Sequence, residues 1–159
     1  MAIKAGYPSD HEHEASQPMK TLSGLDGLFL HLETPATPMH VGSLSLLELP
    51  ANHRGNFCKS VQRHYARRLS LAPVLSRKLA EMPLQLANPV WVQADEVDMK
   101  YHVQRVVLPR PGTQAQLEEC VGRLHSLLLD RTRPLWMVYI IEGLKSGQAA
   151  YYTKIHHAL

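Results

Sequence analysis

The chain has 159 residues, of which 45% are hydrophobic and 19% charged, and its formal net charge is +3. This length suits one globular domain with its own core. The small net charge does not indicate a nucleic-acid-binding protein, whereas a pI near 9.0 still permits anionic ligands or an anionic membrane surface. No apolar stretch approaches the roughly 18 residues of a membrane span, and no signal peptide is recognisable. We interpret Cys58 and Cys120 as reduced thiols of an intracellular protein.

The first 20 residues are polar and show no hydrophobic period. We interpret residues 1–20 as a disordered tail and residues 21–159 as the folded domain. Residues 10–14 of the tail, Asp-His-Glu-His-Glu, carry metal-binding side chain types. A flexible segment offers no fixed coordination geometry, so we expect no metal site.

The domain is predicted to open with a short helix within residues 22–30, capped by Ser23 and Asp26. Three apolar side chains are expected to hold this helix against the body: Leu25, Leu28 and Phe29. Residues 33–39 contain two prolines and indicate an extended linker. Residues 40–49 alternate in part and predict the first sheet strand. We interpret the histidine that begins this strand as structural.

Residues 56–80 are predicted to be helical with a break at Pro73. One face of this helix is apolar at every fourth position: Phe57, Val61, Tyr65 and Leu69. Lys59, Arg63 and Arg67 repeat in the same way on another face. This basic stripe could contact phosphates of a cofactor or of lipid headgroups. A solvated face of a surface helix explains it equally simply, and we favour that interpretation.

Residues 84–92 predict two short strands that turn at Asn88-Pro89. The acidic residues 95–98 are interpreted as a solvated turn. Residues 101–108 predict an edge strand, since Pro109 ends it.

Thr113 and Gln116 form the sequence pattern of a capping box and predict the start of a helix. Its apolar positions follow at helical spacing: Leu117, Cys120, Val121, Leu124, Leu127 and Leu128. Residues 135–143 are apolar at odd and even positions alike, which predicts a central strand covered on both faces. Residues 149–156 are expected to return antiparallel after a tight connection.

Two adjacent histidines, His156 and His157, stand at the end of this last strand. Side chains alternate along a strand, so His156 is expected on the face of Tyr152 and Lys154, and His157 on the other face. A neutral imidazole with an unperturbed pKa of about 6.5 is a suitable general base. No glycine-rich phosphate loop, nucleophile elbow or zinc cluster is present in the sequence.

The ordered motifs resemble a known family. His156-His157-Ala158-Leu159 is similar to the first four residues of the HHxxxDG motif of CoA-dependent acyltransferases. Residues 22–42, with Glu33-Thr34-Pro35 and Pro38-Met39-His40-Val41-Gly42, resemble the opening of bacterial wax ester synthase/diacylglycerol acyltransferases. Pro134-Leu135-Trp136 resembles the PLW motif of that family, and Tyr101-His102-Val103 and Leu108-Pro109 also fit. The resemblance covers about residues 21–159.

This resemblance implies an α/β fold, the N-terminal domain of the chloramphenicol-acetyltransferase-like type, with a mixed, mostly antiparallel sheet flanked by helices. The implied reaction transfers a long-chain acyl group from acyl-CoA, a co-substrate, to a fatty alcohol or diacylglycerol hydroxyl, with no bound cofactor and no metal. His157 would be the general base and His156 a structural support. Pro134, Leu135 and Trp136 would line the substrate tunnel or serve as a structural motif. The implied location is cytoplasmic, with possible peripheral contact to the inner membrane or lipid inclusions, and no nucleic-acid partner.

The Asp-Gly of the motif has no counterpart up to Leu159. We therefore expect an N-terminal acyltransferase domain truncated inside the motif, without the C-terminal domain that would be its partner, and inactive alone. A second hypothesis is a non-catalytic module that docks a C-terminal chain or a membrane surface. A third is a sister family with the same histidines, the peptide condensation domains, although the Pro-Leu-Trp and Glu-Thr-Pro segments argue against it.

Overall fold

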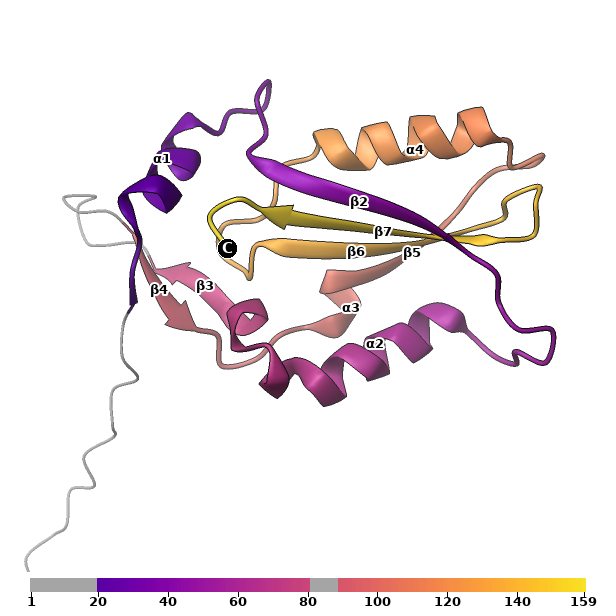
Figure 1. Cartoon of the computed structure of the whole chain (residues 1–159), viewed down its shortest axis with the longest axis horizontal. Helices are drawn as coiled ribbons and strands as arrows, with labels where there is room; N and C mark the ends of the chain where they lie inside the picture. Colours follow the sequence, from indigo (N-terminus) through magenta and orange to yellow (C-terminus); the bar gives the residue numbers. More distant parts are fainter. Residues whose placement is uncertain (1–19, 81–88) are drawn as a thin grey trace, which may run out of the picture.

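The computed structural model describes residues 20–80 and 89–159. Its central element is a four-stranded sheet in the order β2-β7-β6-β5 (Figure 1). The strands are β2 (His40–Leu47), β5 (Val103–Val107), β6 (Trp136–Glu142) and β7 (Ala149–His156). The β2–β7 and β6–β7 pairs are antiparallel, and β5 pairs with β6 in parallel. The structure thus confirms the mixed, mostly antiparallel sheet, the central position of β6 and the edge position of β5.

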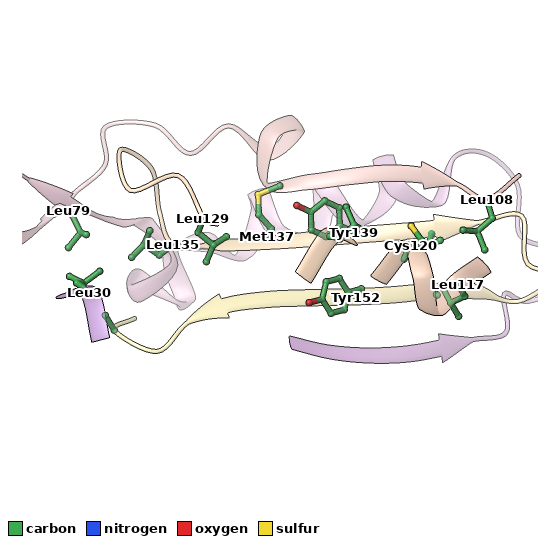
Figure 2. Packing of buried hydrophobic residues seen from close by; sticks show 14 of the residues in the cluster. Leu30, Leu79, Leu108, Leu117, Cys120, Leu129, Leu135, Met137, Tyr139 and Tyr152 are labelled. Atoms are coloured by element: carbon green, nitrogen blue, oxygen red, sulfur yellow. The ribbon is translucent and has the colours of Figure 1, made fainter. Parts of the chain in front are cut away.

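The sheet lies between two helices (Figure 1). The helix α4 (Gln114–Ser126) packs its buried Leu117, Cys120 and Leu124 against one face. Leu117 and Cys120 lie there in the same cluster as Tyr139 and Tyr152 (Figure 2). The helix α2 (Phe57–Arg68) covers the other face. Phe57, Val61 and Tyr65 of the predicted apolar stripe pack there partly buried, whereas the buried residue of the helix is Cys58, which the stripe did not include. All residues of β6 except the last are buried, because helices cover this strand on both sides. Both cysteines are free and buried.

Capping boxes begin two of the helices as predicted. In α1 (Gly24–Leu32) the Ser23 hydroxyl accepts the Asp26 N–H and the Asp26 carboxylate accepts the Ser23 N–H. Thr113 and Gln116 do the same for α4. The predicted inward face of α1 is wrong, because Gly27 and Leu30 are its buried residues, whereas Leu25 and Leu28 are 61% and 49% exposed. A short helix with apolar residues on both sides leaves the inward face undetermined from spacing alone.

A small second sheet has the order β1-β4-β3 and is antiparallel throughout. Its strands are β1 (Lys20–Thr21), β3 (Arg77–Ala80) and β4 (Val90–Gln93). The prediction of helix up to residue 80 is therefore wrong. The α-helix ends at Arg68, two 3-10 turns follow at Leu69–Leu71 and Pro73–Ser76, and β3 begins. Proline at the start of the second turn suits a helical first position but not a continuous helix.

Other boundaries also differ from the sequence-based predictions. The predicted strand at residues 101–108 begins with a short helix, α3 (Met99–His102), because the Asp98 side chain caps two N–H groups there. Residues 33–39 fold into a tight turn closed by Thr34 and Thr37 instead of an extended linker. Leu127 and Leu128 lie beyond the end of α4 and are exposed.

Some predictions lie outside the described residues, namely the tail and acidic segment within residues 1–19 and the strand predicted from residue 84 to the turn at Asn88. The tail was expected to include Lys20, which instead belongs to β1. Within residues 20–80 and 89–159, no helix is long and apolar enough to cross a membrane.

Candidate active site

The histidine pair divides into a buried and an exposed residue at the end of β7. The strand ends at His156, which is 1% exposed, and the exposed His157 follows in a turn. His156 shares its buried face of the sheet with Tyr152 and Lys154, which confirms the predicted alternation. The two imidazoles are therefore in very different solvent environments.

Backbone hydrogen bonds fix both histidines to neighbouring segments. The N–H of His156 donates to the Leu135 carbonyl (3.0 Å), and the N–H of His157 donates to the Met39 carbonyl (2.9 Å). Leu135 directly precedes β6, and Met39 directly precedes β2. The pair thus lies where the ends of three sheet strands meet.

The His156 ring is oriented by its own turn. Its Nδ1 accepts the Ala158 N–H (3.0 Å), so the neutral ring carries its proton on Nε2. This Nε2 lies 3.3 Å from Oε1 of Glu33, but the two atoms are not aligned as a hydrogen bond. Burial lowers the pKa of His156, and the Glu33 carboxylate opposes this shift. The arrangement favours a neutral, structural imidazole.

The ring of His157 instead lies at the surface. It stacks on the Phe29 ring of α1, with a centroid distance of 4.9 Å and an interplanar angle of 21°. The backbone bond to Met39 and this stacking together limit where the imidazole can lie. An exposed, oriented imidazole can exchange a proton with a bound hydroxyl group.

Glu33 is a fully buried carboxylate beside the pair. Its side chain is 0% exposed, and Oε1 accepts the Met39 N–H (3.2 Å). Its Oε2 accepts from Nε (3.3 Å) and an Nη (3.0 Å) of Arg131, which also donates to the Leu30 carbonyl. A buried charge of this kind is stable only when it is paired and hydrogen-bonded.

Two further polar side chains lie on the same face of the sheet. His40 pairs with His156 across β2 and β7 and donates from Nε2 to the His125 carbonyl (2.7 Å). Lys154 is 1% exposed and donates to the carbonyls of Leu124 (2.8 Å) and Leu127, at the end of α4. Burial lowers the pKa of Lys154 to about 8, with Glu33 opposing the shift. The structural interpretation of His40 agrees with its burial and its backbone bond.

Pro134, Leu135 and Trp136 are all buried, and this packing favours a structural role over a tunnel wall. The Trp136 ring stacks on His102 (4.4 Å) and Tyr65 (5.5 Å), and its Nε1 donates to the Leu75 carbonyl (2.7 Å). Through the Leu135 carbonyl the segment also holds the backbone of His156.

The basic residues Lys59, Arg63 and Arg67 are exposed on α2, as expected of a surface face, and are not part of the histidine site. A separate cavity of about 510 Å³ lies between α2 and Tyr151, and neither motif histidine lines it. The Tyr65 and Tyr151 hydroxyls share a hydrogen bond of 2.6 Å at this cavity. Among the described residues, no cluster of three His, Cys, Asp or Glu side chains could hold a metal ion.

Sequence reasoning missed Glu33 and Arg131 as site residues, because 98 positions separate the two partners. The one available signal was the Glu33-Thr34-Pro35 segment of the family resemblance, which gave Glu33 no role. Sequence reasoning also missed that Lys154 is buried. The predicted alternation grouped Lys154 with Tyr152 and His156 on one face, so a usable signal was present.

Comparison with known proteins gives consistent matches. The family model for the wax ester synthase/diacylglycerol acyltransferase catalytic domain matches residues 22–159. The probable diacylglycerol O-acyltransferase tgs3 of Mycobacterium tuberculosis is 42% identical over 138 residues, which are 87% of this chain and 50% of that protein. The probable diacylglycerol O-acyltransferase tgs2 of the same organism is 40% identical over 134 residues, 84% of this chain and 30% of its own length.

Solved structures show the same fold. The wax ester synthase/diacylglycerol acyltransferase from Marinobacter aquaeolei VT8 has a TM-score of 0.75 and 36% identity, over 88% of this chain and 35% of that one. The starter condensation domain of rhizomide synthetase has a TM-score of 0.63 at 13% identity, over 89% of this chain and 33% of that one, and so is similar in fold alone. The chain spans half the length of the tgs3 relative and about a third of the others. It belongs to the wax ester synthase/diacylglycerol acyltransferase catalytic domain family.

Proposed function

We propose that this chain is the N-terminal part of an acyl-CoA-dependent O-acyltransferase that forms wax esters or triacylglycerol. The acceptor would be the hydroxyl of a long-chain alcohol or of diacylglycerol. The division of the histidine pair into a buried His156 and an exposed, oriented His157 supports this proposal most directly. The names of the family and of its relatives support the substrate class.

In the proposed reaction, His157 removes the proton of the acceptor hydroxyl as its oxygen attacks the thioester carbonyl of acyl-CoA. An unassisted alcohol is a poor nucleophile, and proton transfer to a positioned base overcomes this. The C–O bond forms, the C–S bond breaks, and the proton passes to the departing CoA thiolate. His156 stays neutral and holds the turn that carries the base. The tetrahedral intermediate also needs oxyanion donors.

Catalysis is proposed to require the remainder of the acyltransferase domain. The relatives extend well beyond the matched region, and the site described above is open to solvent at His157. A polypeptide that joins this chain to the rest of its domain should therefore form esters, whereas the chain alone should not.

The test is ester formation from a long-chain acyl-CoA with a fatty alcohol or diacylglycerol, measured in that longer polypeptide. His157→Ala should lower the rate by about 10²- to 10⁴-fold, the contribution of general base catalysis. His64→Ala is the matched control, because His64 is an exposed histidine on α2, away from the pair. Retained activity in His157→Ala together with an intact fold would exclude His157 as the base.

A second function, docking on an anionic lipid surface, is supported by α2. This helix contains Lys59, Arg63, Arg67 and Arg68 and no acidic residue. Leu71, just beyond its end, is 79% exposed. Exposed cations beside a protruding apolar side chain suit a surface of anionic lipid headgroups. Peripheral contact with a membrane or lipid inclusion would bring the enzyme to its apolar substrates.

A further inference from the structure

We infer that Glu33 is the positioning residue for both motif histidines, and this inference rests on the proposed role of His157 as the base. Glu33 is the C-cap residue of α1, and its side chain is 0% exposed. A carboxylate without solvent contact must be held by its protein partners. Those partners connect it to each histidine by a separate route.

The route to His157 passes through one residue, Met39. The N–H of Met39 donates to Oε1 of Glu33 (3.2 Å), and the carbonyl of the same residue accepts the N–H of His157 (2.9 Å). The carboxylate therefore fixes the backbone segment on which the His157 backbone rests. A shift of Glu33 would move Met39 and, with it, the imidazole that must reach the substrate hydroxyl.

The route to His156 is direct. Oε1 of Glu33 lies 3.3 Å from the Nε2 of His156. A nearby carboxylate favours a proton on this nitrogen and so leaves Nδ1 free to accept the Ala158 N–H. That bond holds the turn containing His157. The carboxylate thus acts on the position of the base from both sides of the pair.

Arg131 fixes the carboxylate itself. Its guanidinium donates twice to Oε2 of Glu33 and once to the Leu30 carbonyl, from a loop 98 residues away in sequence. The Arg131 side chain is 44% exposed. The guanidinium therefore neutralises the buried charge from the solvent side. Because Arg131 holds Oε2 while the Met39 N–H holds Oε1, the rotation of the carboxylate is restricted.

The test uses the longer acyltransferase polypeptide with Glu33→Gln and Glu33→Ala. Glutamine retains an acceptor for the Met39 N–H but lacks the charge, whereas alanine removes both. We expect kcat to fall about 10- to 100-fold in Glu33→Gln and further in Glu33→Ala, with KM for both substrates within about threefold, because misplacement of a reacting group acts on the chemical step. Glu119→Gln, an exposed glutamate on α4, is the matched control and should retain wild-type kinetics.

A readout independent of activity is NMR of the same variants labelled with ¹⁵N-histidine. In Glu33→Gln the His157 amide should exchange with solvent at least tenfold faster, and the His156 side-chain ¹⁵N signals should shift away from the Nε2–H tautomer. Arg131→Lys gives a second test if Glu33 variants fail to fold, since it loosens the same carboxylate from the surface. Arg131→Lys should lower kcat and speed the exchange of the His157 amide, each by less than Glu33→Gln does.

Wild-type kcat and unchanged His157 exchange in Glu33→Gln would overturn the positioning role while His157→Ala could still confirm the base. Conversely, an active His157→Ala variant would exclude His157 as the base, and Glu33 could then not be positioning a base. The amide exchange data would still decide whether Glu33 holds the two histidines in place. If Glu33→Gln lowered kcat and raised KM by the same factor, with the histidine signals unchanged, Glu33 would have only a general structural role and the positioning role would be excluded.

Discussion

His40 lies directly opposite His156 across β2 and β7, and both imidazoles are buried. Within the described residues, His40 Nδ1 and His156 Nε2 have no hydrogen-bond partner. Burial is the main cause that lowers the pKa of His40 and of His156, although backbone and Glu33 contacts oppose it. Both rings are therefore expected to be neutral in the folded protein at neutral pH.

The pKa shifts of these histidines predict that acid destabilises the fold. Below the ordinary pKa of about 6.5 the unfolded chain binds more protons than the folded one, so the free energy of unfolding should fall as pH decreases from 7 to 5. Each histidine contributes a slope of at most about 1.4 kcal/mol per pH unit. Urea unfolding at several pH values measures this slope, and His40→Asn should reduce it. A slope that is the same in His40→Asn would contradict the lowered pKa of His40.

Gly42 is predicted to tolerate no side chain, because a Cβ there would lie 2.6 Å from the Tyr152 hydroxyl. Tyr152 is 2% exposed, and its hydroxyl bonds the His125 ring. Gly42→Ala should therefore lower the free energy of unfolding by about 1–3 kcal/mol, as overpacking does. Gly122→Ala, in α4 where the added Cβ meets nothing, should raise it by about 0.5–1 kcal/mol. Thermal unfolding of both variants measures whether their changes in stability have these opposite signs.

Trp136 distinguishes the two interpretations of the Pro-Leu-Trp segment. A ring packed between His102 and Tyr65 predicts that Trp136→Ala lowers the free energy of unfolding by about 3–5 kcal/mol. Trp136→Phe should cost less, because it retains a stacking ring and loses mainly the bond to the Leu75 carbonyl. Denaturant unfolding measures both. A stable Trp136→Ala variant with a changed KM for acyl-CoA would instead favour a tunnel wall.

Elements defined by local chemistry were predictable from the sequence. The capping boxes at Ser23 and Thr113 identified the starts of α1 and α4, and the apolar run of β6 identified the central strand. The strand β3 could not be predicted from the sequence, because Arg77–Ala80 follows a helical pattern and becomes a strand only by pairing with β4. Such pairing depends on a partner about ten residues further on, which no local propensity contains.

The parts of the site that depend on neighbouring residues were likewise predictable, whereas the contacts between distant segments were not. Alternation correctly placed His156 on the same face as Tyr152 and Lys154, because it depends only on neighbouring residues. The ion pair of Glu33 with Arg131 joins the end of α1 to the loop before β6, so it requires the complete fold. The inward face of α1 also depended on that contact region, where Leu30 rather than Leu28 meets the core.

The basic face of α2 predicts binding to anionic lipid. Vesicles of phosphatidylcholine with anionic phosphatidylglycerol should sediment with the protein at low salt and release it as salt rises, since exposed charges are screened over about 10 Å at 0.1 M. Replacing Lys59, Arg63 and Arg67 together by glutamine should remove each residue's contribution of about 1 kcal/mol. Leu71→Ser should weaken binding at every salt concentration. Equal binding of the triple variant would exclude this face.

The lowered pKa of Lys154 predicts that the fold becomes more stable in mild alkali. Burial lowers its pKa to about 8, from 10.5 in an ordinary environment, so between these values the unfolded chain binds the additional proton. The free energy of unfolding of the wild type should therefore rise between pH 8 and 10 by up to about 3 kcal/mol relative to that of Lys154→Met. The methionine variant is the reference because it has no group to titrate at this position. Denaturant unfolding of both proteins at pH 7.5, 8.5 and 9.5 measures the difference. A difference that shrinks or stays constant over this range would show that the Leu124 and Leu127 carbonyls keep the ammonium fully charged, and would contradict the lowered pKa.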